Sequence, residues 1–214
     1  MESFRPWRGG YLAKADATER KFFAGLASDV AHMLGRPFDR MPEAPSRPRH
    51  AERDPLEAYE AELAGLGDDA PVFASTMDEA FVRLMPDMSE DPDAAASLRA
   101  MTQDGVASVK SSHLLVFYRS VTASTDDVWV GEDDMRAWIS AVNSIRIVCA
   151  SRLGIDDDAR AGEIYEKAQE LTGMAGGSGR EIDNTDDLLA VLYTMLTWWQ
   201  ESLLAAVRNK RLRG

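Results

Sequence analysis

The sequence contains a single cysteine, Cys149, so no disulfide can form within the chain. With only three histidines as well, it has few of the side chains that bind transition metals. No apolar run reaches the roughly 18–20 residues needed to span a bilayer, and the first residues lack the apolar core of a signal peptide. A lone cysteine suits a reducing compartment, so we expect a cytoplasmic protein that does not insert into a membrane.

Positive charge is also scarce, because 24 basic residues face 36 acidic ones and the net charge is −12. This balance argues against unspecific attraction to nucleic acid or to an anionic bilayer. Two stretches are basic nevertheless. Residues 36–53 carry five arginines against three acidic residues, and 208–214 carry four basic residues. Solvated segments are the favoured interpretation of both, and contact with an acidic partner or nucleic acid stays open.

The motifs that mark enzymes and cofactor sites are missing. His32, His50 and His113 form neither an HxH nor an HExxH pattern, and Asp156–Asp158 lacks the glycine and distal glutamate of a calcium loop. The stretch GMAGGSGR at 173–180 lacks the Lys–Ser/Thr pair of a phosphate loop, and no GxSxG is present. We therefore expect a protein that is not an enzyme, with no catalytic residues, no cofactor and no metal.

Capping signals and helical periodicity dominate the rest of the chain. Asp16 and Glu19 form a capping-box pattern, and Asp91–Pro92 is a typical helix start. The predicted fold is mostly α, a helical bundle with a small N-terminal β-hairpin. We expect one domain over 1–214, with a flexible Pro/Arg-rich linker at 36–53 and a flexible Gly-rich loop at 173–180. The expected helices cover about 16–34, 54–66, 78–85, 91–122, 133–153, 159–172 and 186–207, with a hairpin at 4–14 and a short strand at 128–130.

Three local details follow from the same patterns. Gly9–Gly10 is expected to form the two-residue turn of the hairpin. Phe22 is expected on the buried face of the first helix, together with Phe23 and Val30. In the helix over 91–122, the spacing predicts an apolar stripe that includes Leu98, Met101, Gly105, Val109 and Val116. Toward the C-terminal half this stripe is broadened by Leu114, Leu115, Phe117 and Val121.

Two polar residues interrupt apolar stripes in the last part of the chain. Gln200 falls within the stripe of the helix over 186–207, and Arg146 falls within that of the helix over 133–153. A buried amide without partners costs about 1–3 kcal/mol. We therefore predict that the two helices pack together around a polar cluster of Asn143, Arg146, Gln200 and Glu201. A structural clamp is the favoured role, and an anion or partner-peptide pocket around Arg146 stays open.

Three stretches of the sequence share a pattern with a known protein family. They are FRPWRGGYLAK at 4–14, a pattern of Trp–Ile, Val–Asn and Arg–Ile pairs within 133–154, and a closing motif within 192–203. With these motifs the chain resembles a bacterial domain-of-unknown-function family that includes the AosR oxidative stress regulator. The residues of the second and third stretches are Trp138–Ile139, Val142–Asn143, Arg146–Ile147, Arg152–Leu153–Gly154, Leu192–Tyr193, Leu196 and Trp198–Leu203.

The resemblance implies a regulator connected with transcription and stress, acting through protein contacts. A redox role in the family implies a pair of cysteines, and Cys149 alone excludes an intrachain redox switch. An inert buried thiol is the favoured interpretation of Cys149. We expect a non-enzymatic regulatory protein with a protein partner, and a homodimer through an apolar helix face. The alternatives are a direct DNA-binding regulator and a small-anion sensor centred on Arg146.

Overall fold

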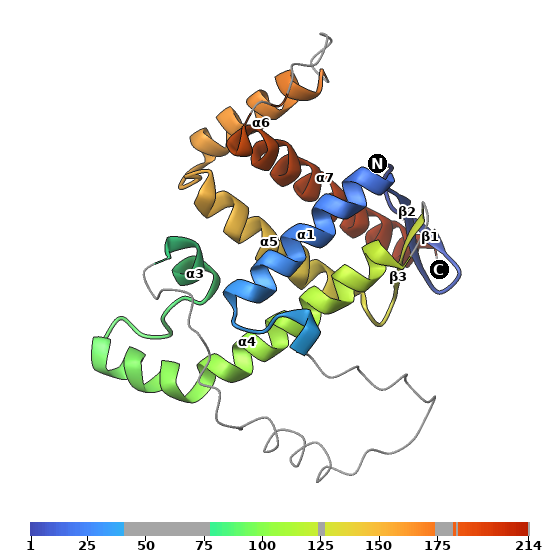
Figure 1. The fold of residues 1–214 in the computed structure, drawn as a ribbon. Coiled ribbons are helices and arrows are strands. Elements are labelled where there is room, and N and C mark those ends of the chain that lie inside the picture. Colours follow the sequence, from blue (N-terminus) through green and yellow to red (C-terminus); the bar gives the residue numbers. More distant parts are fainter. Residues whose placement is uncertain (41–77, 124–126, 174–181, 183, 214) are drawn as a thin grey trace, which may run out of the picture.

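The computed structural model describes residues 1–40, 78–123, 127–173, 182 and 184–213. Within them the chain is mostly α-helical with a small antiparallel sheet, as predicted (Figure 1). The helix expected over 54–66, most of the linker at 36–53 and nearly all of the loop at 173–180 lie outside the described residues. That the whole chain forms one domain therefore stays a prediction. The helices are α1 (Ala17–Met33), α3 (Glu79–Leu84), α4 (Pro92–Thr122), α5 (Met135–Arg152), α6 (Asp158–Thr172) and α7 (Thr185–Arg213), with a 3-10 turn η1 (Phe38–Arg40).

Three strands form the sheet in the order β1 (Arg5–Trp7), β2 (Gly10–Lys14) and β3 (Asp127–Gly131). The predicted hairpin and the predicted strand around residue 129 are both present, and they pair with each other. The turn position was wrong by one residue. Trp7 pairs with Gly10, so the turn residues are Arg8 and Gly9, with φ of 38° and 76°. Positive φ at both positions suits the twist of a tight hairpin.

Helix α1 begins as the capping box predicts. The Asp16 carboxylate accepts hydrogen bonds from the backbone N–H groups of Thr18 and Glu19, and the Glu19 side chain accepts from the Asp16 N–H. The buried face, however, is rich in alanine, and Phe22 is exposed, so the prediction for Phe22 was wrong. The small side chains suit the close packing of α1 against α4. The buried residues of α1 are Phe23, Ala24, Ala27, Val30 and Ala31.

Helix α4 also begins at the predicted cap, where the Asp91 carboxylate accepts from the Asp93 N–H. The first part of the predicted stripe was wrong, because Leu98, Met101 and Val109 are exposed, whereas Leu114, Phe117 and Val121 of its C-terminal half are buried. The buried face has small residues in the first part of the helix and larger ones from Leu114 onward. Its members are Ala95, Ala107, Ser111, Leu114, Phe117 and Val121.

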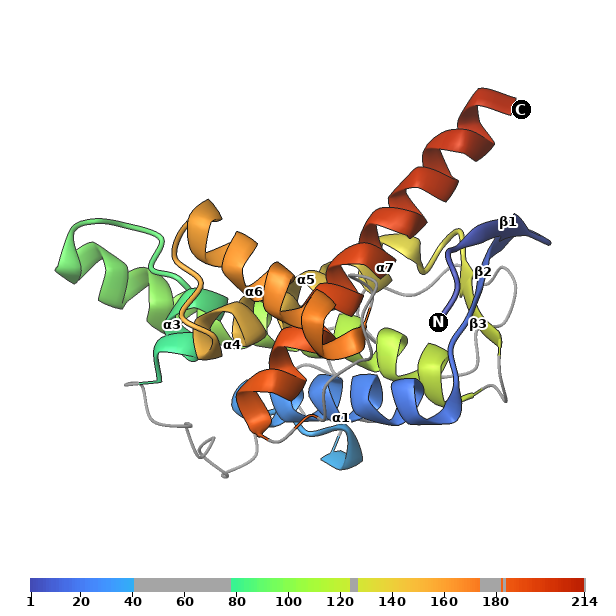
Figure 2. The ribbon, with the colours of Figure 1, turned by 90° about the horizontal axis from the view of Figure 1, so that it is seen from above.

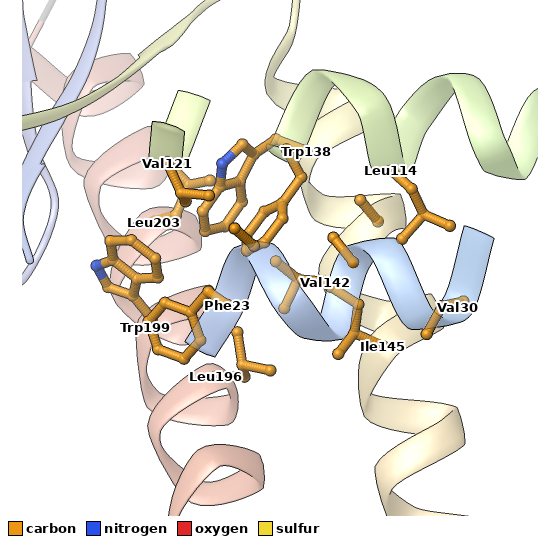
Figure 3. Packing of buried hydrophobic residues seen from close by; sticks show 14 of the residues in the cluster. Phe23, Val30, Leu114, Val121, Trp138, Val142, Ile145, Leu196, Trp199 and Leu203 are labelled. Carbon is orange, nitrogen blue, oxygen red and sulfur yellow. The ribbon is translucent and has the colours of Figure 1, made fainter. Parts of the chain in front are cut away.

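The core centres on Trp138 of α5 and Trp199 of α7, whose ring centroids lie 5.4 Å apart (Figure 3). Phe4 stacks on Trp199 at 5.1 Å and meets Trp138 edge-on at 5.2 Å. The N–H of Phe4 donates to Ser202 Oγ on α7 at 3.3 Å. The N-terminal strand is thus attached to the last helix by both aromatic packing and a hydrogen bond.

Helix α7 is the longest element after α4 and contacts α5, α6 and the sheet. Its C-terminal end runs beyond the other helices on the side of the sheet (Figure 2). There Lys210 pairs with Glu132 and its ammonium lies over the Tyr11 ring. The helix extends six residues past the predicted end at Val207. No helix in the described ranges is long and apolar enough to cross a membrane.

Candidate functional site

The predicted seam between α5 and α7 contains a hydrogen-bonded arginine. Arg146 donates from Nε to Thr197 Oγ1 and from Nη1 to Gln200 Oε1, each at 2.9 Å. Its guanidinium also lies over the Tyr193 ring, 5.5 Å from the centroid. Tyr193, Thr197 and Gln200 are spaced by four and three residues, so they share one side of α7. We call Tyr193, Thr197, Gln200 and Arg146 the seam cluster.

The structure brings together two of the four residues predicted for this cluster. Asn143 and Glu201 are exposed, and neither side chain makes a hydrogen bond or ion pair with any described residue. Asn143 lies about 60° around α5 from Arg146, at 100° per residue, which is enough to turn it out of the seam. Thr197 and Tyr193 were missed, although their spacing from Gln200 was a usable signal.

The partners of Arg146 are all neutral. Gln200 is only 9% exposed, so its amide oxygen needs the bond from Arg146. Arg146 is half-buried and keeps part of its surface in water, which lets it do without the carboxylate of Glu201. The seam cluster therefore has the properties of a clamp between two helices, with a guanidinium whose charge no described side chain neutralises.

A second polar–aromatic surface lies on the outer face of the sheet, the face directed away from the core. Trp7 is 44% exposed and Trp129 is 46% exposed. Arg5 and Arg8 are exposed, and their guanidinium carbons lie 5.5 and 5.3 Å from the Trp7 ring centroid. Strand register explains the grouping, because Arg5, Leu12 and Trp129 are cross-strand neighbours. We call Arg5, Trp7, Arg8 and Trp129 the sheet patch.

Two glycines make room for the indole of Trp129. A Cβ on Gly10 would lie 3.0 Å from two atoms of this ring and 2.3 Å from the Val130 carbonyl oxygen. A Cβ on Gly131 would lie 3.1 Å from another atom of the ring. Gly10 thus permits both the close pairing of β2 with β3 and the placement of Trp129 across the sheet. Sequence reasoning missed the sheet patch, because β3 is far from the hairpin in the chain.

Within the described parts of the chain, Cys149, His113 and His32 do not form a cluster. Burial raises the pKa of the Cys149 thiol to about 12, so it is protonated near neutral pH. Burial and the nearby Lys110 lower the pKa of His113, whose Nδ1 lies 3.0 Å from Ser140 Oγ. Nδ1 of His32 lies 2.8 Å from the backbone oxygen of Ser28. Over the described ranges, no three His, Cys, Asp or Glu residues are placed to hold a metal ion.

The sequence was compared with curated proteins, solved structures and models of protein families. No curated protein and no solved structure matches it. A family model does match, and it extends over residues 1–207. This range includes the seam cluster and the sheet patch. The chain therefore belongs to the family described as "Domain of unknown function (DUF2017)".

Proposed function

We propose that this protein is a non-enzymatic regulatory protein that binds an acidic segment of a protein partner through the sheet patch. The observation that carries the proposal is the pair of half-exposed tryptophans flanked by two arginines. Tryptophan and arginine are the residue types that contribute most often to the binding energy of protein interfaces. A soluble chain gains little from leaving two large indoles in water unless they are covered in a complex.

Charge supports an acidic partner segment. Arg5 and Arg8 form no ion pair with any described residue, and both contact the ring of Trp7. A carboxylate of the partner could form an ion pair and hydrogen bonds with these guanidinium groups. The net charge of −12 weakens the case for nucleic acid as the ligand, because phosphate backbones are repelled over long range.

The resemblance to the AosR family extends the proposal to transcription-related stress regulation. Such a role fits a protein that acts by contact, without chemistry of its own. Oxidation of Cys149 is left out of the proposal, because the thiol is buried and its raised pKa keeps it protonated.

The test begins with capture of partners from a lysate of the source cells on immobilised protein. Each candidate partner is then purified and its affinity is measured by calorimetry. The double variant Trp7→Ala/Arg8→Glu should weaken binding by at least about tenfold, since hot-spot residues contribute 2 kcal/mol or more. Met101→Ala is the matched control, because Met101 is an exposed apolar residue on α4.

Equal binding by wild type, Trp7→Ala/Arg8→Glu and Met101→Ala would remove the sheet patch from the proposal. A gel shift with duplex DNA at several salt concentrations tests the DNA-binding alternative. If DNA is retained and only the double variant loses it, the sheet patch binds nucleic acid and the protein-partner proposal fails.

The seam cluster supports a second candidate, a small-anion sensor centred on Arg146. The supporting observation is that the half-buried guanidinium has only neutral acceptors and an aromatic ring around it. A thermal-shift series with phosphate, sulfate and acetate should then show stabilisation in the wild type and none in Arg146→Gln. If the anions raise the melting temperature of the wild type and of Arg146→Gln equally, the effect is a general stabilisation by salt.

A further inference from the structure

One side of α7 is exposed along its C-terminal half. The other side of this half carries the buried residues Trp199, Leu203, Ala206 and Val207. On the exposed side, Trp198, Leu204 and Leu212 are 43%, 47% and 79% exposed. The charged residues Glu201, Arg208 and Arg211 on the same side are also exposed. This part of the helix therefore has an uncovered face that is partly apolar. It consists of Trp198, Glu201, Leu204, Ala205, Arg208, Arg211 and Leu212, and we call it the α7 stripe.

The α7 stripe has the seven-residue spacing that is typical of two helices packed along each other. Trp198, Ala205 and Leu212 follow one another at intervals of seven, which returns them to the same side of the helix after two turns. Glu201 and Arg208 are also seven apart and occupy the positions between them. Neither Glu201 nor Arg208 forms an ion pair with any described residue.

The order of charges decides which partner helix fits. The acidic residue lies toward the N-terminal end of the stripe, and Arg208 and Arg211 lie toward its C-terminal end. A second α7 stripe running in the opposite direction would therefore place Glu201 of each copy beside Arg208 of the other. A parallel arrangement would instead place like charges together, which is unfavourable.

We propose that two copies of this chain associate through their α7 stripes, packed antiparallel about a two-fold axis near Ala205. In this arrangement Trp198 of one copy packs against Leu212 of the other. The small side chain of Ala205 lets the helices approach at the axis. The contact is the same on both copies, as a closed two-fold dimer requires.

A groove beside the stripe provides space for the second copy. It has a volume of about 540 Å³ and lies between the N-terminal strand and α7. Trp198, Glu201 and Ala205 belong both to its wall and to the stripe. A partner helix lying on the stripe would thus run along this groove. The other wall is formed by Ser3, Phe4, Arg5 and Pro6.

The stripe is short, so the dimer should be weak. From residue 198 to 212 the helix extends about 20 Å at 1.5 Å per residue. Two such helices bury an area at the low end of specific interfaces, and we expect a dissociation constant on the order of micromolar. The proposal rests on α7 and not on Trp7, Arg8 or Trp129, although Arg5 of the sheet patch also lines the groove beside the stripe.

The test is the oligomeric state by sedimentation velocity over a concentration series. Glu201→Arg alone and Arg208→Glu alone should each weaken the dimer at least about tenfold, because each brings two like-charge pairs together. The double variant E201R/R208E should restore self-association. An equimolar mixture of the two single variants should also form dimers, since all of its cross-pairs have opposite sign.

Circular dichroism establishes that each variant folds, and Met101→Ala is the control outside the stripe. A wild type that stays monomeric over the whole series would overturn the proposal. So would a dimer whose dissociation constant is the same in the wild type and in both single variants. Loss of dimer in E201R/R208E equal to that in the single variants would exclude the antiparallel pairing.

Discussion

The tryptophans of this protein occupy two contrasting environments. Trp138 and Trp199 are completely buried where α5, α7 and the N-terminal strand meet, whereas Trp7 and Trp129 are half-exposed on the sheet. The contrast is sharpest between the neighbours Trp198 and Trp199, because one is exposed and the other has no exposed surface. Buried indoles stabilise the fold, and exposed ones are available for contacts with other molecules. One residue type therefore serves two purposes according to the face on which it lies.

The strongest test of this contrast compares the two adjacent tryptophans. Trp199→Ala should lower the free energy of unfolding by about 3–5 kcal/mol, the usual cost of removing a large aromatic side chain from a core. Trp198→Ala should change it by only about 1 kcal/mol, because Trp198 is 43% exposed and its removal leaves no closed cavity. Urea denaturation followed by circular dichroism measures both. Similar losses for the two variants would break the distinction.

The sheet offers a second comparison, between two glycines. Gly10→Ala places a Cβ 2.3 Å from the Val130 carbonyl oxygen, so β2 and β3 must separate. We expect a loss of about 1–3 kcal/mol in the free energy of unfolding. Gly105→Ala in α4 meets no atom within 4 Å and should instead stabilise the protein by up to about 1 kcal/mol. Thermal unfolding of both variants shows whether each substitution raises or lowers the stability. An unchanged stability of Gly10→Ala would contradict the close approach of Gly10 to the Val130 carbonyl oxygen.

The seam cluster can be compared with the exposed residues once assigned to it. Arg146→Met removes both hydrogen bonds and should cost about 1–2 kcal/mol, since the amide of Gln200 then lacks a partner. Asn143→Ala should cost less than about 0.5 kcal/mol. A double-mutant cycle with Gln200→Leu isolates the coupling between Arg146 and Gln200. A coupling energy of zero would show that this hydrogen bond does not stabilise the seam.

The smallest expected effect concerns the buried thiol. The pKa of Cys149 is about 12 in the folded protein and lies near 9.0 when the thiol is unperturbed. A raised folded-state pKa gives stability that is present below pH 9 and is lost as the pH rises toward 12. At pH 10 the loss should be about 1 kcal/mol relative to Cys149→Ala. Denaturant unfolding of both proteins at pH 7.5 and 10 measures it, and parallel changes in the two would refute the assignment.

Helix ends were predictable because their signals are local. Asp16 with Glu19, and Asp91 with Pro92, each specify a cap within four residues. The pairing of Arg146 with Gln200 was predictable for a related reason, since helical periodicity places a polar residue within an apolar stripe on each of two long helices. A buried amide then requires a partner.

The failures arise where the outcome depends on tertiary packing and not on a local pattern. Packing between helices selects side chains that fit, and the largest apolar ones are not always those. In α4, the small residues Ala107 and Ser111 are buried, while Met101 is 81% exposed. Counting large apolar residues therefore identified the wrong face in the N-terminal part of α4. Similarly, the pairing of Tyr11 with Val130 depends on the whole fold, and no local pattern indicates that Gly10 lies beneath Trp129.

The attachment of Phe4 to α7 has a consequence for synthesis of the chain. The hydrogen bond from Phe4 to Ser202 joins residues that are 198 positions apart in sequence. On the ribosome, Phe4 therefore cannot make its contacts with Trp199 and Ser202 until almost the entire chain has been synthesised. Such long-range contacts slow folding and leave early segments unprotected. A chaperone that holds the nascent N-terminal segment would therefore be expected to raise the yield of native protein.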